Sequence, residues 1–138
     1  MSLKLIRFGV SMEEGLLMKF DAILRKAGYN NRSEAIRDLI RKNIVEEEWK
    51  KGEVVAGSIM LVYSHHQREL LEKIMDIQHG FHGIIISTQH VHMDDDKCLE
   101  IIVVKGQVEK IKGIYNSLSA LKGVKYASLS RATTGKKL

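Results

Sequence analysis

The sequence predicts an α+β fold in two units, one strand with two helices followed by a βαββαβ unit, and three observations support this prediction. The first 45 residues change from apolar alternation, typical of a strand, to apolar spacings of three and four, typical of helices. From Glu53 onward six segments follow in the order strand, helix, strand, strand, helix, strand. The 138 residues are 44% hydrophobic and 28% charged, a composition typical of folded chains.

The first element is a short strand over residues 6–12. Every second residue there is apolar, so one face is buried and the other presents Arg7, Gly9 and Ser11. A unit of this size cannot pair its only strand or close a core alone, so it must dimerise. Two such strands, paired antiparallel against four helices, form the ribbon-helix-helix arrangement, whose two-stranded ribbon fits a DNA major groove.

Two helices complete the first unit. The first covers residues 16–27 and ends at Gly28, which can adopt the left-handed conformation of a helix C-terminus. The second begins near Asn31, where Asn31 or Ser33 caps the first turn. The free backbone amides of Asn31, Arg32 and Ser33 are also a candidate phosphate contact.

A polar run separates the two units. Glu46–Glu48 and the residues up to Gly52 break the apolar pattern, so we expect a DNA-binding unit at 1–48, a short connection at 49–53 and a second unit at 54–138. The second unit is predicted to contain strands 54–63, 84–93, 99–104 and 124–129 and helices 67–77 and 108–121. This order is that of a ferredoxin-like domain.

The charge distribution and the cysteine content indicate the kind of partner and the cellular compartment. Of the formal net charge of +5, residues 1–45 carry +4, from nine basic and five acidic residues, which favours double-stranded DNA as a partner of the first unit. A single cysteine excludes an internal disulfide framework. The first ten residues lack the apolar core of a secretory signal, and no apolar run approaches the roughly 18 residues that span a membrane. We therefore expect a cytoplasmic protein.

Histidines and the cysteine gather around the predicted hairpin of the second unit. His90 and His92 are two apart in a strand, so both imidazoles project from one face of the sheet. If the hairpin closes symmetrically about Asp95, His92 faces Cys98 across the ladder. His90, His92 and Cys98 are thus three candidate ligands of one metal ion. His79, at the end of the preceding helix, is the candidate for the fourth, and a second subunit that donates it is the natural alternative to the same chain.

The donor types restrict the metal without selecting one. Imidazoles and a thiolate suit first-row transition metals and not Mg²⁺ or Ca²⁺. A tetrahedral arrangement suits zinc, whereas ligands from alternate residues of a flat sheet favour a planar one, which suits Ni(II) or Cu(II). Four protein ligands leave no position for a reactive water, so the pattern predicts a sensor and not an enzyme.

Taken together, these residues resemble the NikR family of nickel-responsive transcriptional regulators, over nearly the whole chain. The motifs that carry the resemblance are Gly28–Asp38 (GYNNRSEAIRD), Gln78-His79, His90-Val91-His92 and Cys98-Leu99-Glu100. The resemblance implies a homotetramer, with a ribbon-helix-helix dimer at each end and a core of four ACT domains. It also implies nickel bound by the hairpin residues of one chain and by His79 of its neighbour, with bound nickel favouring operator binding and usually repressing nickel uptake.

The same resemblance implies further site residues. Arg7, Gly9 and Ser11 match base-contacting positions, although threonine is common where this chain has Gly9 and Ser11, so the operator sequence cannot be carried over. Glu34 and Asp38, which share a helix face, match a second cation site. The remaining candidates are His65, His66 and His82 for auxiliary metal binding and Gln78 and Glu100 for orienting the ligands.

Two other functions compete with this interpretation. The ACT-like unit would sense an amino acid or another small metabolite if the histidines were incidental, and nickel titration of Cys98→Ala separates the two cases. A zinc hydrolase would need a general base beside an open metal position, and the sequence offers no convincing one.

Overall fold

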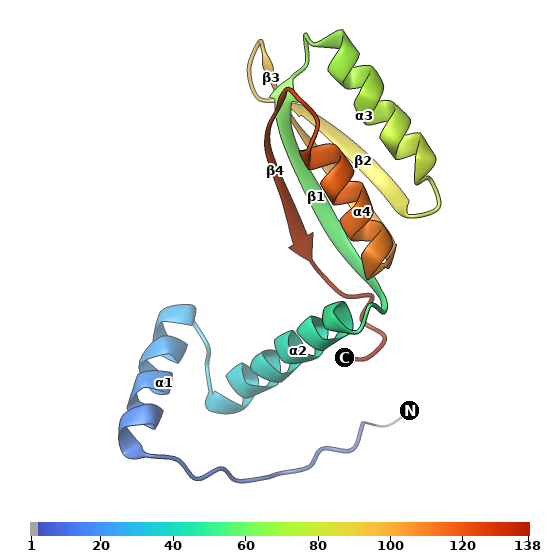
Figure 1. The fold of residues 1–138 in the computed structure, drawn as a ribbon. Coiled ribbons are helices and arrows are strands. Elements are labelled where there is room, and N and C mark those ends of the chain that lie inside the picture. The colour runs from blue at the N-terminus through green and yellow to red at the C-terminus, as the bar shows by residue number, and fades with distance from the viewer. Residues whose placement is uncertain (1–2) are drawn as a thin grey trace. The chain divides into compact units, whose positions relative to one another are not determined.

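The computed structural model describes residues 3–138, which form two compact units that divide between Arg41 and Lys42, within helix α2 (Arg32–Lys50). Figure 1 shows the elements in chain order. None of the helices in the described residues is long and apolar enough to cross a bilayer.

The first unit contains helix α1 (Glu14–Ala27) and the beginning of α2, joined by a tight turn as predicted. Gly28 has a φ of +79°, so it forms the expected left-handed end of α1. The side-chain oxygen of Asn31 accepts a hydrogen bond from the amide of Glu34 at 2.9 Å. Asn31 therefore caps α2, which settles its competition with Ser33.

In one chain the segment before α1 is not a strand within the described residues 3–13, so the strand expected over 6–12 stays a prediction for the paired unit. A strand needs hydrogen-bonding partners, and one copy of this unit supplies none to the segment. Its apolar side chains are consequently open to solvent: Ile6, Phe8 and Val10 are 78%, 69% and 61% exposed. An exposed apolar row of this kind is typical of a surface that a second chain covers.

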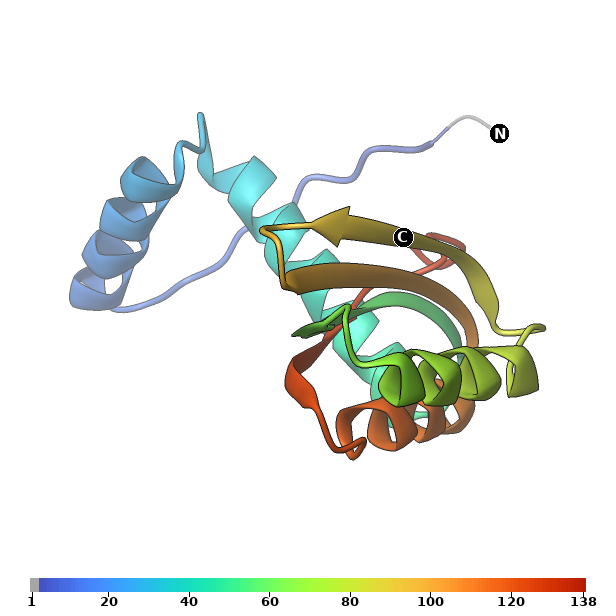
Figure 2. The ribbon, with the colours of Figure 1, turned by 90° about the horizontal axis from the view of Figure 1, so that it is seen from above.

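The second unit is a four-stranded antiparallel sheet with two helices on one face, visible edge-on in Figure 2. Its elements are β1 (Val54–Ser64), α3 (Arg68–Gly80), β2 (Ile85–His92), β3 (Lys97–Gln107), α4 (Val108–Ser119) and β4 (Val124–Arg131). The strand order β2-β3-β1-β4 is that of a ferredoxin-like domain, so the predicted βαββαβ fold is confirmed, with ends that differ by a few residues.

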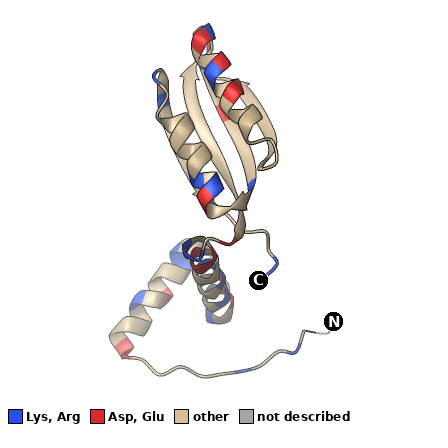
Figure 3. Ribbon diagram, turned by 45° about the vertical axis from the view of Figure 1, so that its right-hand side comes forward, with Lys and Arg blue, Asp and Glu red and all other residues tan. Residues whose placement is uncertain are grey.

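The core of this unit lies between the sheet and its two helices. Buried and half-buried residues alternate along β1, and Ile59 and Leu61 are completely buried, as are Ile111 and Ile114 of α4. Each such side chain contributes about 1.5–3 kcal/mol on burial. The outer side of α3 carries charges of both signs, with an ion pair of 3.0 Å between Lys73 and Glu69 (Figure 3). These charged side chains stay in solvent, so the opposite, apolar stripe of α3 packs against the sheet.

Helix α2 continues to Lys50, through the first two residues of the connection expected at 49–53. Trp49 explains this difference, because its side chain is 2% exposed and belongs to the core. Its indole nitrogen donates a 2.9 Å hydrogen bond to the carbonyl of Ala132, and the guanidinium of Arg131 lies 5.6 Å from the ring centroid. The domain limits of 1–48 and 54–138 stay a prediction.

Candidate metal centre

The β2–β3 hairpin has the register that the sequence predicts. His92 pairs with Cys98, and His90 pairs with Glu100. Because each strand alternates its side chains between the two faces, these four residues project from the same face of the sheet. The prediction that His92 lies across the ladder from Cys98 is therefore confirmed.

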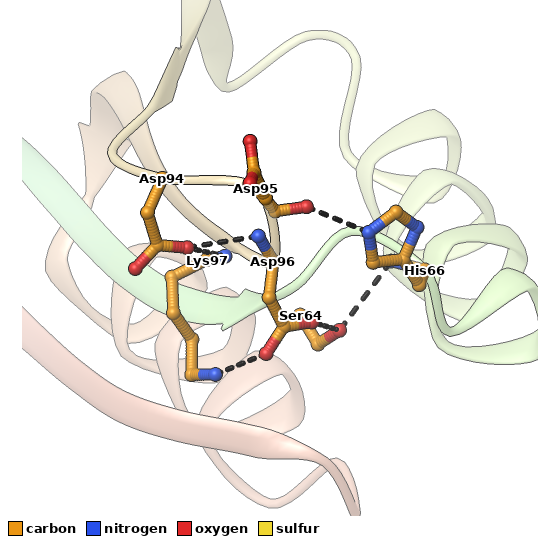
Figure 4. Close-up of polar contacts among 6 residues, drawn as sticks. All are labelled: Ser64, His66, Asp94, Asp95, Asp96 and Lys97. Atoms are coloured by element: carbon orange, nitrogen blue, oxygen red, sulfur yellow. Dashed lines mark hydrogen bonds and ion pairs between the residues drawn. The ribbon is translucent and has the colours of Figure 1, made fainter.

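Hydrogen bonds fix the turn of this hairpin and join it to the start of α3 (Figure 4). The carboxylate of Asp94 accepts hydrogen bonds from the amides of Asp96 and Lys97 at 2.8 and 2.6 Å. Asp96 bonds to Ser64 and Lys97, and the ring of His66 meets the carbonyl of Asp95 at 2.7 Å. We call these contacts the hairpin clasp.

Two carboxylates of the hairpin clasp, those of Asp94 and Asp96, remain charged over the physiological pH range, because hydrogen bonds lower their pKa values. Hydrogen bonds from Lys97 and Ser64 lower the pKa of Asp96 to about 2. The carboxylates of Asp94 and Asp96 therefore act as turn and clasp groups, in agreement with the local hydrogen bonding of aspartates in tight turns, and Asp95 contributes its backbone carbonyl.

Two of the expected ligands lie close together in a single chain. The ring nitrogen Nδ1 of His90 lies 3.9 Å from the sulfur of Cys98, which is 1% exposed. The ring of His92 instead stacks on His65, with parallel planes and ring centroids 4.6 Å apart. Among residues 3–138 of one chain, no three His, Cys, Asp or Glu side chains are grouped so as to hold a metal ion. The ligand set of His79, His90, His92 and Cys98 stays a prediction.

A buried carboxylate lies beside His90. Glu100 has no exposed surface, and its two oxygens accept hydrogen bonds of 2.6 Å from Tyr63 and Gln78. Nε2 of His90 lies 3.3 Å from the same carboxylate. Burial and the Glu100 carboxylate both raise the pKa of Tyr63, so its phenol keeps its proton and donates it. Glu100 and Gln78 were singled out from the sequence, whereas Tyr63 was missed because its strand pattern predicts only a core residue.

His79 is positioned by the end of α3. It lines a cavity of about 300 Å³ together with His90, Glu100 and the apolar side chains Leu71 and Ile74. The cavity lies where the last turns of α3 face β2 and β3. The structure thus brings His79 and His90 of one chain to the same cavity, and the source of the fourth ligand stays a prediction.

The auxiliary histidines lie at both ends of α3. His65 and His66 precede the helix with ring centroids 4.3 Å apart, and Nε2 of His65 is buried without a hydrogen-bond partner. His82 follows the helix, is exposed, and has Nδ1 3.4 Å from the carbonyl of His79. His65 and His66 lie together and His82 belongs to the opposite end of the helix, so the structure does not bring the three into one cluster.

The candidate DNA contacts and the second cation site belong to the first unit. Arg7, Gly9 and Ser11 are exposed on the extended segment. The guanidinium of Arg32 binds both carboxylate oxygens of Asp21 at 2.9 Å, which orients it at the start of α2.

Of the two expected cation ligands, Asp38 already has partners: it accepts a 2.8 Å hydrogen bond from Tyr29 and pairs with Arg41 at 3.3 Å. Glu34 lies one helical turn earlier on α2 and is half-buried. A cation bound by this pair would compete with the partners of Asp38.

Comparison with known proteins identifies the family. A family model described as "NikR C terminal nickel binding domain" matches residues 56–132. A protein of Syntrophus aciditrophicus named as a nickel-responsive regulator is 52% identical over 95% of this chain and 96% of its own length. One of Dictyoglomus thermophilum with the same description is 56% identical over 92% and 95%. The chain belongs to the NikR family.

The family model covers all four strands and both helices of the second unit, apart from the first two residues of β1. The NikR domain therefore includes the hairpin with His90, His92 and Cys98, as well as His79 on α3. A solved structure of an uncharacterized Thermotoga maritima protein, TM1266, shares the fold, with a TM-score of 0.53, 14% identity, and coverage of 57% of this chain and 98% of that one.

Proposed function

We propose that this NikR chain is a nickel-responsive, DNA-binding transcriptional regulator that acts in the cytoplasm as a homotetramer and represses nickel uptake when Ni(II) is bound. The observation that carries the proposal is the hairpin register, which brings a buried thiol and an imidazole within 3.9 Å in the domain that matches the family's nickel-binding model. It is not an enzyme, in keeping with its family.

The donor set fits nickel. His90, His92 and Cys98 would hold the ion with His79, and a thiolate with imidazoles satisfies a first-row metal of planar preference. When bound, the ion supplies a bridge between protein groups and no reaction. The chain's own contribution is preorganisation: the hairpin clasp fixes the turn, and Glu100 with Gln78 positions the imidazole of His90.

The first unit supplies DNA recognition. Two copies of the extended segment would pair through the exposed apolar row and direct Arg7, Gly9 and Ser11 outward. Arg7 and Ser11 contribute base contacts, Gly9 allows close approach, and Asn31, Arg32 and Ser33 contact phosphate at the start of α2. We also propose a second cation site at Glu34 and Asp38. Auxiliary metal binding is proposed at His65, His66 or His82.

Nickel controls DNA binding through linkage. A ligand changes DNA affinity only if it binds more tightly to the arrangement that binds DNA. A metal held by residues of two subunits meets this condition, because it stabilises one arrangement of the subunits over others. The tetramer is thus part of the mechanism.

The test is a nickel titration of operator binding by the wild type, Cys98→Ala and Arg7→Ala. Nickel should strengthen binding by the wild type and leave Cys98→Ala unchanged. Arg7→Ala should lose about 1–3 kcal/mol of operator binding and keep its nickel affinity. If Cys98→Ala bound nickel as tightly as the wild type, the proposed centre would be contradicted. A regulator that senses a small metabolite would then be favoured.

A further inference from the structure

A second cavity, of about 250 Å³, lies where α2 ends and β1 begins, far along the chain from the ligand hairpin. Its polar lining residues are Asn43, Glu47, Glu48, Lys51, Glu53 and Lys137. Three carboxylates therefore line it with two lysines. No part of the proposed nickel or DNA site uses these residues.

Glu48 is the unusual member of this lining. The residue is 5% exposed, and its side-chain oxygen Oε2 is buried without a hydrogen-bond partner. The neighbouring acids differ from it, because Glu53 pairs with Lys137 and Glu47 lies 3.3 Å from Lys50. A buried carboxylate without a partner is costly, and Glu48 belongs to the cavity lining, so a cation held in the cavity would compensate its charge.

The position of these acids on the helix strengthens the case. Glu46–Glu48 occupy the last turns of α2, where the carbonyl ends of the helix carry partial negative charge and favour cations. The helix ends there because Gly52 has a φ of +72° and the amide of Glu53 bonds to the carbonyl of Glu48 at 3.2 Å. The acidic residues and the helix end thus add to a negative field at the cavity, which Lys51 and Lys137 offset in part.

We propose that this cavity binds a hydrated divalent cation of the Mg²⁺ class, with Glu48 as its anchoring carboxylate. All neutral and anionic donors of the lining are oxygens, which hard cations prefer. Ca²⁺ needs six to eight oxygen ligands, and within the described residues no three His, Cys, Asp or Glu side chains are grouped to supply such a cage. Mg²⁺ usually keeps several waters and uses one or two carboxylates, and the cavity is several times the roughly 30 Å³ of one water.

The experiment uses Mn²⁺ as a paramagnetic probe for this site. Free Mn²⁺ is counted by electron paramagnetic resonance during titration of the full, nickel-loaded protein, its Glu48→Gln variant and its Glu46→Gln variant. Glu46 is exposed on the same turn, so its variant carries the same charge change away from the cavity. We expect Glu48→Gln to bind Mn²⁺ about tenfold more weakly at one site per chain, and Glu46→Gln to behave as the wild type. Equal titration curves for all three proteins, or equal weakening in both variants, would overturn the proposal.

A second variant, in the exposed C-terminal segment, tests the same proposal if Glu48→Gln does not fold. Lys137→Ala removes a positive charge from the cavity and frees Glu53. Mn²⁺ affinity should rise in this variant, because the cavity becomes more negative. An affinity equal to that of the wild type would overturn the proposal, and circular dichroism of each variant establishes that it is folded.

Discussion

Glu100 shows how much of the proposed nickel centre depends on residues that are not expected ligands. Its carboxylate has no exposed surface, accepts hydrogen bonds from Tyr63 and Gln78, and lies 3.3 Å from His90. Two donors and an imidazole on one carboxylate leave the His90 ring little freedom to turn. A preorganised ring binds a metal without first having to be ordered.

Glu100→Gln should therefore weaken nickel binding by about 10–100-fold, the usual effect of removing a group that orients a ligand. Glutamine has the same size but only one acceptor oxygen, so it cannot satisfy both Tyr63 and Gln78. The measurement is a competition titration of nickel against a chelator, with Glu69→Gln on the exposed face of α3 as the matched control. Unchanged affinity in a folded Glu100→Gln protein would show that Glu100 is only a core residue.

At the scale of elements, the two helices of the first unit are joined by one exposed pair. Arg32 at the start of α2 holds both oxygens of Asp21 on α1. The hydrogen bonds from Arg32 lower the pKa of Asp21 from its ordinary value of 3.8. The carboxylate is therefore ionised in the folded unit at a pH where the unfolded chain has begun to bind a proton.

The stability from this pair is present above the unfolded pKa of Asp21 and is lost as pH falls through the lower, folded pKa. Asp21→Asn should thus lower the unfolding temperature at neutral pH, and the difference from the wild type should shrink at an acidic pH well below the ordinary pKa of 3.8. Thermal unfolding followed by circular dichroism at both pH values checks this. A difference that is constant with pH would indicate a packing effect in place of the ion pair.

Local patterns predicted the elements that local forces determine. Gly28 and Asn31 mark the turn between α1 and α2, and the alternation in β2 and β3 predicted that His92 faces Cys98. The strand over 6–12 could not be confirmed in one chain, because its hydrogen-bonding partner is another copy of the same segment.

Long-range contacts account for what the patterns missed. The acidic run suggested an early end to α2, but burial of Trp49 against a segment more than eighty residues later extends the helix. The contact of Tyr63 with Glu100 joins β1 to β3, and no spacing within either strand reports it. Stacking of His92 on His65 is likewise set by the join between β1 and α3.

At the scale of the whole molecule, the main question is which chain donates His79. In one chain His79 and His90 line the same cavity, yet no group of three potential ligands assembles within the described residues. A metal that connects subunits stabilises one of their arrangements and so meets the condition for linkage, and the proposed function therefore predicts a donor from the neighbour. Two variants that each lack one proposed nickel ligand can be mixed to show which chain supplies His79.

His79→Ala and Cys98→Ala should each lose the nickel–thiolate absorption, because each lacks a ligand of every site. If His79 crosses to the neighbour, an interface between the two variants contains one complete site, with His79 from the Cys98→Ala chain and the hairpin from the His79→Ala chain. Unfolding the variants together and refolding them should then restore part of the absorption. Refolded separately and then pooled, they should stay inactive, which is the control. If every ligand came from one chain, no mixture would contain a complete site, and absence of recovery in refolded mixed oligomers would contradict subunit-bridging nickel.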